Sequence, residues 1–300
     1  MPVLLAVGLG YSAKELARRL RGAGWRIIGT SRSAEGVAAI EGLGYKAIRF
    51  DGTSASSALS EAVGEATHLL VSAAPGAEGD PLLARHGADL RAAKLKWIGY
   101  LSTIGVYGNH DGAWIDEDTP PAPTSRRGRA RLDAEQAWSE LGAETGTPVD
   151  IFRLAGIYGP GRGPLEKLRR GDARAIIKPG QVFNRIHVAD IARVLEAAIA
   201  HQGTPSRTAR IFNVADDEPA PPQDVLDFAA SLLGIRPPPH IPFEQAEVSP
   251  MARSFYADNK RVSNARIKRV LGVGLGCPTY REGLRRDNAQ AGQLRPSARC

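Results

Sequence analysis

The chain has 300 residues, of which 43% are hydrophobic and 24% charged, and its formal net charge at pH 7 is +7. This length and apolar content allow a sizeable core, and no run of about 18 apolar residues predicts a membrane span. The N-terminus goes straight into an apolar strand pattern without a charged leader or cleavage site, so we expect no signal peptide.

The two cysteines, Cys277 and Cys300, are too few for a disulfide framework and predict free thiols in a cytoplasmic protein. With six scattered histidines they offer no metal-ligand spacing, so no metal is expected. Basic residues gather at 126–131, 167–174 and 260–269, but acids interrupt these runs and aromatic residues do not alternate with them. We interpret them as solvated faces with some phosphate contacts, and expect no nucleic-acid partner.

Predicted strands and helices alternate through the first half of the chain. Apolar runs predict strands at residues 3–7, 25–29, 45–50, 67–72, 97–102 and 149–154. Helical periodicity follows the first strand and recurs at residues 34–41, 57–63, 80–94 and 132–141. This alternation predicts right-handed βαβ crossovers and a doubly wound, mostly parallel α/β sheet, with ligands at the carboxyl ends of its strands.

The second half of the chain predicts a smaller α/β part. A glycine- and proline-rich loop at 159–164 is followed by helices at 165–170, 189–200, 222–233, 264–271 and 280–285, and by a strand at 210–214. We predict a Rossmann domain from residues 1–158 and 184–216, and a small substrate-side domain from residues 159–183 and 217–286. Residues 287–300 are polar and aperiodic, which predicts a disordered tail.

The first strand leads into a glycine-rich turn. Gly8 permits a tight turn, Gly10 lets a pyrophosphate approach the backbone, and Ala13 lets the following helix lie close to the strand. The free N–H groups at the helix start, at Tyr11 and Ser12, would face the phosphates. This G-x-G-x-x-A pattern between a strand and a helix predicts a dinucleotide site, with an ordinary turn as the alternative.

The end of the second strand bears on which dinucleotide binds. Thr30, Ser31 and Arg32 stand where an NAD enzyme usually carries a carboxylate on the ribose. A guanidinium and two hydroxyls suit a 2′-phosphate, so the sequence favours NADP, while Glu35 keeps NAD as the alternative. Asp51 is expected either to contact the adenine amino group or to cap a turn. Small residues would line the adenosine and pyrophosphate side: Ala73, Ala74 and Pro75.

Five segments in this order make the chain similar to the extended short-chain dehydrogenases/reductases of the NAD(P)-dependent epimerase/dehydratase group. They are the glycine turn and residues 101–108, 153–161, 184–190 and 212–216. The resemblance implies a Rossmann domain with a C-terminal domain that closes on a substrate, and cofactor contacts from Ala155 and Ile157. Nucleotide-sugar modification is the commonest chemistry of that group.

The chain departs from the resemblance at the family's Tyr-x-x-x-Lys pair. The alignment that fits Glu135 puts Arg127 at the tyrosine position and Arg131 at the lysine position. The family phenol moves a proton, whereas an arginine stays protonated and can only hold an anion or a ribose hydroxyl. The i,i+4 spacing keeps both arginines on one helical face. Arg131 could therefore take over lysine's contact with the nicotinamide ribose.

Three hydroxyl residues lie near the end of the fifth strand. Ser102 or Thr103 would polarise a substrate carbonyl, or would cap the strand end. Tyr107 is a candidate for a displaced acid, with a packing tyrosine as the alternative. We predict an NADP(H)-binding oxidoreductase or epimerase/dehydratase-type enzyme acting on a small substrate, a nucleotide sugar or another anion. A non-catalytic NADP(H) sensor or scaffold is the alternative, and the oligomeric state stays open, a homodimer included.

Overall fold

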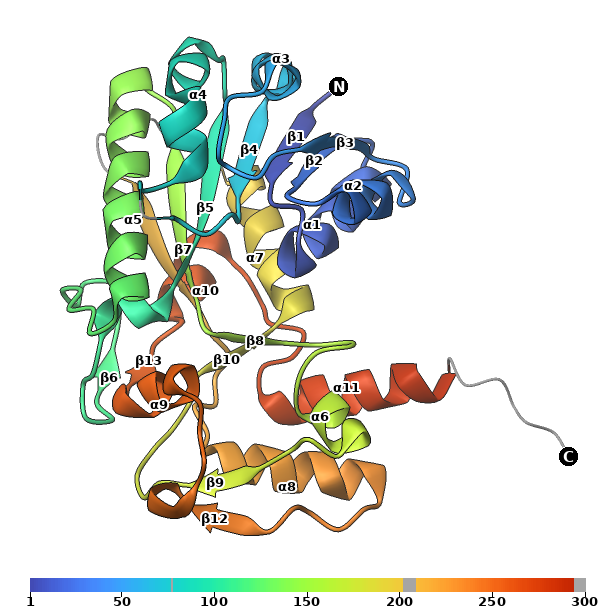
Figure 1. The fold of residues 1–300 in the computed structure, drawn as a ribbon, viewed down its shortest axis with the longest axis vertical. Coiled ribbons are helices and arrows are strands. Elements are labelled where there is room, and N and C mark those ends of the chain that lie inside the picture. Colours follow the sequence, from blue (N-terminus) through green and yellow to red (C-terminus); the bar gives the residue numbers. More distant parts are fainter. Residues whose placement is uncertain (77, 202–208, 294–300) are drawn as a thin grey trace, which may run out of the picture.

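The computed structural model describes residues 1–76, 78–201 and 209–293. Its centre is a seven-stranded parallel sheet in the order β11-β7-β5-β4-β1-β2-β3 (Figure 1). Every residue of β1, β4 and β7 is buried, because helices cover both faces. The predicted doubly wound α/β fold is confirmed. The strands are β1 (Val3–Val7), β2 (Arg26–Ser31), β3 (Lys46–Arg49), β4 (His68–Val71), β5 (Trp97–Thr103), β7 (Val149–Leu154) and β11 (Arg210–Val214).

Two hydrophobic clusters hold the helices to the two faces of this sheet. Leu16 of α1, Ile40 of α2 and Leu195 of α7 belong to one cluster. Leu59 of α3 and Trp138 of α5 belong to the other, together with the buried face of α4. The strand order reverses between β1 and β4, and such a switch point opens a crevice at the carboxyl ends. The helices are α1 (Tyr11–Gly22), α2 (Ala34–Glu41), α3 (Ser57–Glu65), α4 (Pro81–Ala92), α5 (Arg126–Thr145) and α7 (Val188–Ala200).

A second group of elements lies below the carboxyl ends of the sheet in Figure 1. α6 and α8 pack with α11 around a separate apolar cluster that includes Leu165, Val225 and Tyr280. α9 packs through Tyr256 in a further small cluster. The helices are α6 (Pro164–Arg170), α8 (Pro222–Leu233), α9 (Pro250–Ala257), α10 (Ala265–Leu271) and α11 (Tyr280–Gln293), with 3-10 turns η1 (Ile104–Tyr107) and η2 (Phe243–Gln245).

Six short strands pair outside the main sheet, and the sequence analysis predicted none of them. Each has two or three residues and is too short to show a period-2 pattern, so only its partner fixes it. These parallel pairs are β6 (Trp114–Ile115) with β13 (Arg261–Val262), β8 (Gly156–Tyr158) with β10 (Arg185–His187), and β9 (Ala175–Ile177) with β12 (His240–Pro242).

The structure differs from the predicted boundaries at two places. α10 falls in the stretch 217–286 assigned to the small domain, yet its Ile267 packs in the same cluster as α1 and α7 of the sheet. The tail was expected to begin at residue 287, but α11 continues to Gln293, and buried Asp287 accepts a hydrogen bond from His187 Nε2 at 3.0 Å. Residues 294–300, with Cys300, lie outside the described residues. No helix in the described part of the chain is long and apolar enough to cross a membrane.

Candidate active site

Side chains from β2 and from the end of β4 hold the turn between β1 and α1. Gly8 has φ +83°, and its N–H donates to Thr30 Oγ1 at 2.9 Å. Ser72 Oγ donates to the Gly8 carbonyl. A Cβ on Gly8 would lie 3.0 Å from Ser72 Oγ and 3.1 Å from the Ala73 nitrogen, so the position accepts glycine alone without adjustment.

The N-terminus of α1 is open to a ligand. Gly10 is its N-cap, no side chain caps it, and its first turn holds no acid. The first N–H groups of the helix therefore lack side-chain acceptors, and the helix dipole favours negative charge there. A close-fitting glycine turn and an uncapped helix start suit the diphosphate of a dinucleotide.

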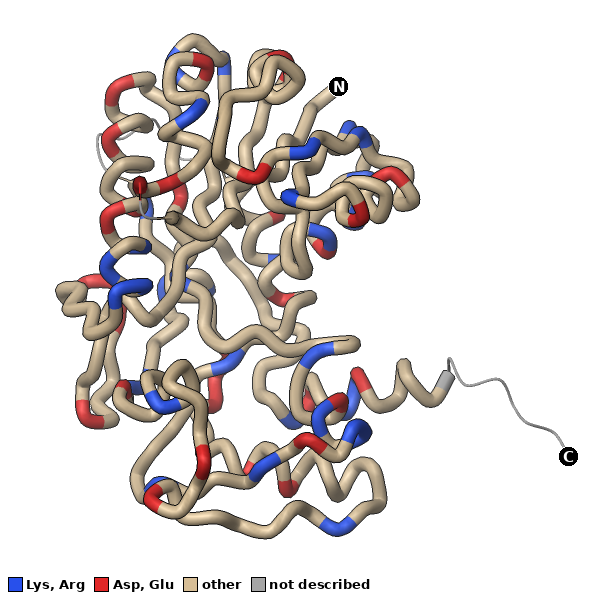
Figure 2. Tube along the Cα trace, in the orientation of Figure 1, with Lys and Arg blue, Asp and Glu red and all other residues tan. Residues whose placement is uncertain are grey.

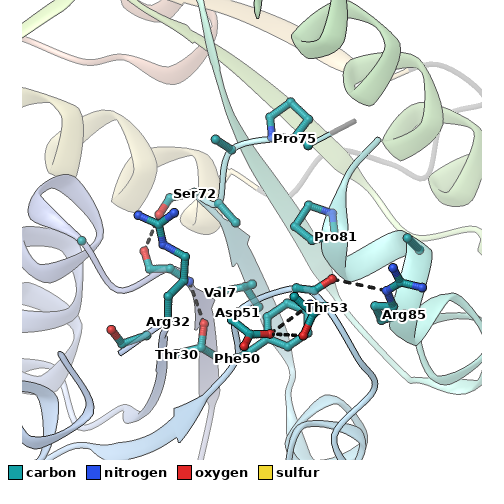
Figure 3. Close-up of a pocket in the computed structure, with 18 of the residues that line it drawn as sticks. Val7, Thr30, Arg32, Phe50, Asp51, Thr53, Ser72, Pro75, Pro81 and Arg85 are labelled. Carbon is teal, nitrogen blue, oxygen red and sulfur yellow. Dashed lines mark hydrogen bonds between the residues drawn. The ribbon is translucent and has the colours of Figure 1, made fainter. Parts of the chain in front are cut away.

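A cleft of about 890 Å³ opens beside this turn, at the carboxyl ends of β1 to β4 (Figure 3). Its walls also include residues that the sequence analysis did not name, among them Phe50, Ser72 and Arg85. Phe50 and Ser72 directly follow β3 and β4, and only that position could have identified them, whereas Arg85 lies within α4 and gave no such signal. Nine predicted cofactor residues line the cleft: Gly8, Gly10, Thr30, Ser31, Arg32, Asp51, Ala73, Ala74 and Pro75.

Arg32 and Arg85 extend from opposite sides of the cleft in Figure 3. Arg32 is exposed and forms no ion pair with any residue the structure describes. Arg85 instead pairs with Glu78 Oε2 at 2.5 Å and donates to the Gly52 carbonyl at 3.3 Å. The Glu35 carboxylate turns back to the start of its own helix, where hydrogen bonds to its backbone and to Ser33 lower its pKa. Neither Glu78 nor Glu35 therefore neutralises the charge of Arg32, which lies beside the glycine turn.

Asp51 adopts the turn-capping arrangement. Its Oδ1 accepts from the Thr53 N–H at 3.0 Å and from Thr53 Oγ1 at 2.7 Å, and these bonds lower the pKa of the Asp51 carboxyl. Asp51 still lines the cleft (Figure 3), so a ligand bound there could contact it even though it caps the turn.

Five predicted cofactor residues do not line this cleft, namely Arg131, which is described in the next paragraph, and four others. Tyr11 donates to the Pro160 carbonyl at 2.9 Å, and burial raises the pKa of its phenol to about 12. Ser12 and Ala155 are buried, at 7% and 5% exposure, and Ile157 packs against the core cluster. Packing explains why these side chains are absent from the cleft wall. Ser12 lies on the buried face of α1, and Ile157 lies in β8, which pairs with β10.

Arg131 lies at the end of the cleft away from Arg32. Its Nη1 donates to the Leu101 carbonyl at 2.7 Å, to Tyr100 Oη at 3.2 Å and to the carbonyl of the cleft residue Ala73 at 3.5 Å. The guanidinium is thus fixed at the carboxyl ends of β4 and β5. This is the edge where the lysine of the resemblance would meet the nicotinamide ribose.

The two hydroxyl candidates on β5 differ in what they can still donate. Ser102 is 5% exposed and donates to Glu135 Oε1 at 2.5 Å. Glu135 is in turn held by Arg153, whose Nη2 lies 2.7 Å from Oε2. Thr103 is half-buried, and its Oγ1 accepts from the Gly105 N–H at 3.1 Å, which leaves its own proton available. The geometry therefore favours Thr103 over Ser102 as the polarising hydroxyl.

Tyr107 is enclosed in the core rather than exposed to a ligand. The residue is fully buried, its Oη donates to Asn213 Oδ1 at 2.8 Å, and the Arg153 guanidinium lies 4.7 Å from its ring centroid. Burial raises the pKa of the phenol. The packing alternative is the one that the structure adopts.

Arg127, at the family's tyrosine position, is exposed in the first turn of α5. Its guanidinium lies 5.6 Å from the ring centroid of Phe255 on α9, a residue the sequence analysis did not identify. No pattern could have found this contact, because the two helices are far apart in the sequence. Among the described residues, no group of acids, histidines and cysteines could hold a metal ion.

The sheet order, the glycine turn and the cleft at the switch point define a Rossmann-type dinucleotide-binding protein. A model of the NAD dependent epimerase/dehydratase family matches residues 88–215. Over these residues, somewhat less than half of the chain, it is similar to this family and to the extended short-chain dehydrogenase/reductase type of oxidoreductase, whose members use a nicotinamide dinucleotide.

Three relatives illustrate the range of similarity. A Silicibacter pomeroyi protein of unknown function is 51% identical, with 97% of this chain and 99% of that one covered and a TM-score of 0.88. A Methylobacillus flagellatus protein, provisionally an NAD-dependent epimerase/dehydratase, is 29% identical over 97% and 98% of the two chains, with a TM-score of 0.73. Protein YeeZ of Escherichia coli K12 is 28% identical over 252 residues, 79% of this chain and 86% of the relative.

Proposed function

We propose that this protein binds NADP(H) and acts as an oxidoreductase or epimerase/dehydratase-type enzyme on a small anionic substrate. The observation that carries the proposal is the cleft of about 890 Å³, with the glycine turn at its centre and Arg32 unpaired among its lining residues. A bound nicotinamide dinucleotide supplies hydride transfer.

The preference for NADP rests on charge. Arg32 follows β2, where a ribose-binding acid would favour NAD, and Glu35 is turned away toward α2. Arg49 adds a second cation near this end, because its Nε donates to the Arg32 carbonyl at 3.4 Å. A 2′-phosphate would gain charge-assisted hydrogen bonds from such groups.

Arg127 and Arg131 limit the chemistry that the protein can perform on a substrate. Arg127 and Arg131 cannot donate and recover a proton near neutral pH, so neither replaces the family's phenol as acid or base. They can neutralise negative charge on a substrate or on a group that becomes negative during reaction. Thr103 would orient the reacting oxygen, and water would supply the proton. We place the protein in a reducing cytoplasm, where buried Cys277 stays a free thiol.

Calorimetry with NADPH and NADH tests the cofactor assignment. Arg32→Asp should weaken NADPH binding by about 1–3 kcal/mol, roughly 5- to 150-fold, and NADH binding much less. Arg269→Asp is the matched control, since Arg269 is also exposed but lies on α10. Equal weakening of both cofactors by Arg32→Asp would contradict the NADP assignment. Loss of nicotinamide absorbance with a panel of anionic carbonyl compounds tests turnover, and cofactor binding without any turnover would favour a sensor.

A further inference from the structure

Arg127 and Phe255 form a paired, exposed surface outside the residues that line the dinucleotide cleft. The guanidinium carbon lies 5.6 Å from the ring centroid. Phe255 is 56% exposed, and Arg127 is exposed and forms no ion pair with any described residue. A charged group and a flat apolar group are therefore both presented to solvent at one place.

The pair lies next to the end of the dinucleotide cleft. Arg131 contacts the carbonyl of Ala73, which lines the cleft, and Arg127 stands one helical turn before Arg131, about 6 Å along the axis of α5. Figure 1 shows α9, which carries Phe255, just below the N-terminal end of α5. A small molecule that touches Arg127 and Phe255 would thus lie beside the nicotinamide end of the cofactor.

The charges of α5 point to an anionic ligand here. The basic half begins the helix and the acidic half ends it, which Figure 2 shows as blue below and red above. This order opposes the helix dipole, which favours acids at the N-terminus and bases at the C-terminus. An anion at the first turn would remove the conflict. The charged residues are Arg126, Arg127, Arg129 and Arg131, then Asp133, Glu135, Glu140 and Glu144.

The exposed face of α9 limits what the anion can carry. Met251 and Phe255 are one turn apart and are 57% and 56% exposed. Phe255 presents a flat ring, and aromatic pairs gain stabilisation beyond the area that they bury, which a saturated sugar ring does not. A flat conjugated group would instead stack on Phe255 while its carboxylate met the planar guanidinium.

Building on the proposed function, we infer that the substrate is a small carboxylate conjugated to an aromatic or unsaturated group. The carboxylate binds Arg127, and the flat apolar part packs on Phe255. This assigns Arg127 a binding role at the position where the family has its proton-transferring tyrosine.

trans-Cinnamate is the test probe, titrated by calorimetry into the protein with NADP⁺ and, in parallel, without it. We expect cinnamate to bind at least 10-fold more tightly than its uncharged analogue cinnamamide and more tightly than glucose 1-phosphate. Arg127→Gln should weaken cinnamate binding at least 10-fold, Arg127→Lys less, and Phe255→Ala at least 3-fold. Arg126→Gln is the matched control and should bind cinnamate as the unaltered protein does, with melting curves confirming that each variant is folded.

Either of two results would overturn the inference: glucose 1-phosphate binding more tightly than cinnamate, or equal losses in Arg127→Gln and Arg126→Gln. Absence of cinnamate binding in both titrations would overturn it as well. NADP⁺ binding, measured first in the same samples, separates this failure from that of the proposed function, because it does not depend on Arg127.

Discussion

The buried ion pair between Glu135 and Arg153 is the strongest test of how the site is supported. Arg153 donates to Glu135 through Nε at 3.2 Å and through Nη2 at 2.7 Å, and the two side chains are 4% and 2% exposed. Ser102 on β5 donates to the same carboxylate. The pair therefore joins α5, which carries both site arginines, to β7 and β5.

Glu135→Ala would leave the Arg153 guanidinium buried without its anion. Removing one partner of a buried pair costs about 3–5 kcal/mol. The Ser102 hydroxyl would also lose its acceptor, so we expect the upper half of that range. Since natural domains have about 5–15 kcal/mol of total stability, this variant should unfold at a clearly lower urea concentration. Glu135→Leu with Arg153→Met removes both charges and should recover at least about 2 kcal/mol of the loss.

Urea denaturation followed by circular dichroism measures this cost, with the m-value checked for constancy. A loss below about 1 kcal/mol in Glu135→Ala would refute the reasoning, because a dry buried guanidinium cannot lose its partner so cheaply. A double variant no more stable than the single one would show that packing, not charge, sets the cost.

The other predictions concern single positions. Gly8→Ala should abolish NADPH binding in calorimetry while the protein stays folded, because the new Cβ needs φ +83° and meets Ser72; retained affinity would contradict the assigned turn. Tyr107→Phe should cost about 1–3 kcal/mol in a urea titration, since Asn213 loses its donor, yet leave NADPH affinity unchanged; weaker binding would restore Tyr107 to the site. Burial raises the pKa of Asp216 from 3.8 to about 8. Between pH 4 and pH 8 the Asp216 carboxyl is therefore protonated in the folded state and ionised in the unfolded state. Stability should therefore fall as pH rises from 4 to 8, by no more than about 5 kcal/mol, and Asp216→Asn should flatten that slope; an equal slope in both proteins would refute the assignment.

The sequence alone determined the sheet and the centre of the dinucleotide cleft. Apolar runs that alternate with helices predict a parallel sheet, and Gly8, Gly10 and Thr30 of the diphosphate turn lie within the first thirty positions, although Ser72 completes the turn from the end of β4. Arg32 could be placed for the same reason, because it directly follows β2. The signals for these features are local, because each strand and the glycine turn can be recognised from residues that are adjacent in the sequence.

Only the tertiary structure decided what the polar side chains near β5 can do. Ser102 and Thr103 are neighbours in sequence. The Ser102 hydroxyl donates its hydrogen bond to Glu135, whereas the Thr103 hydroxyl only accepts one and keeps its own proton available. Asn213 and Arg153 enclose Tyr107, and α9 brings Phe255 to Arg127. Each of these outcomes depends on a partner far along the chain, and a hydrogen bond or ring contact leaves no pattern in the residues between its ends.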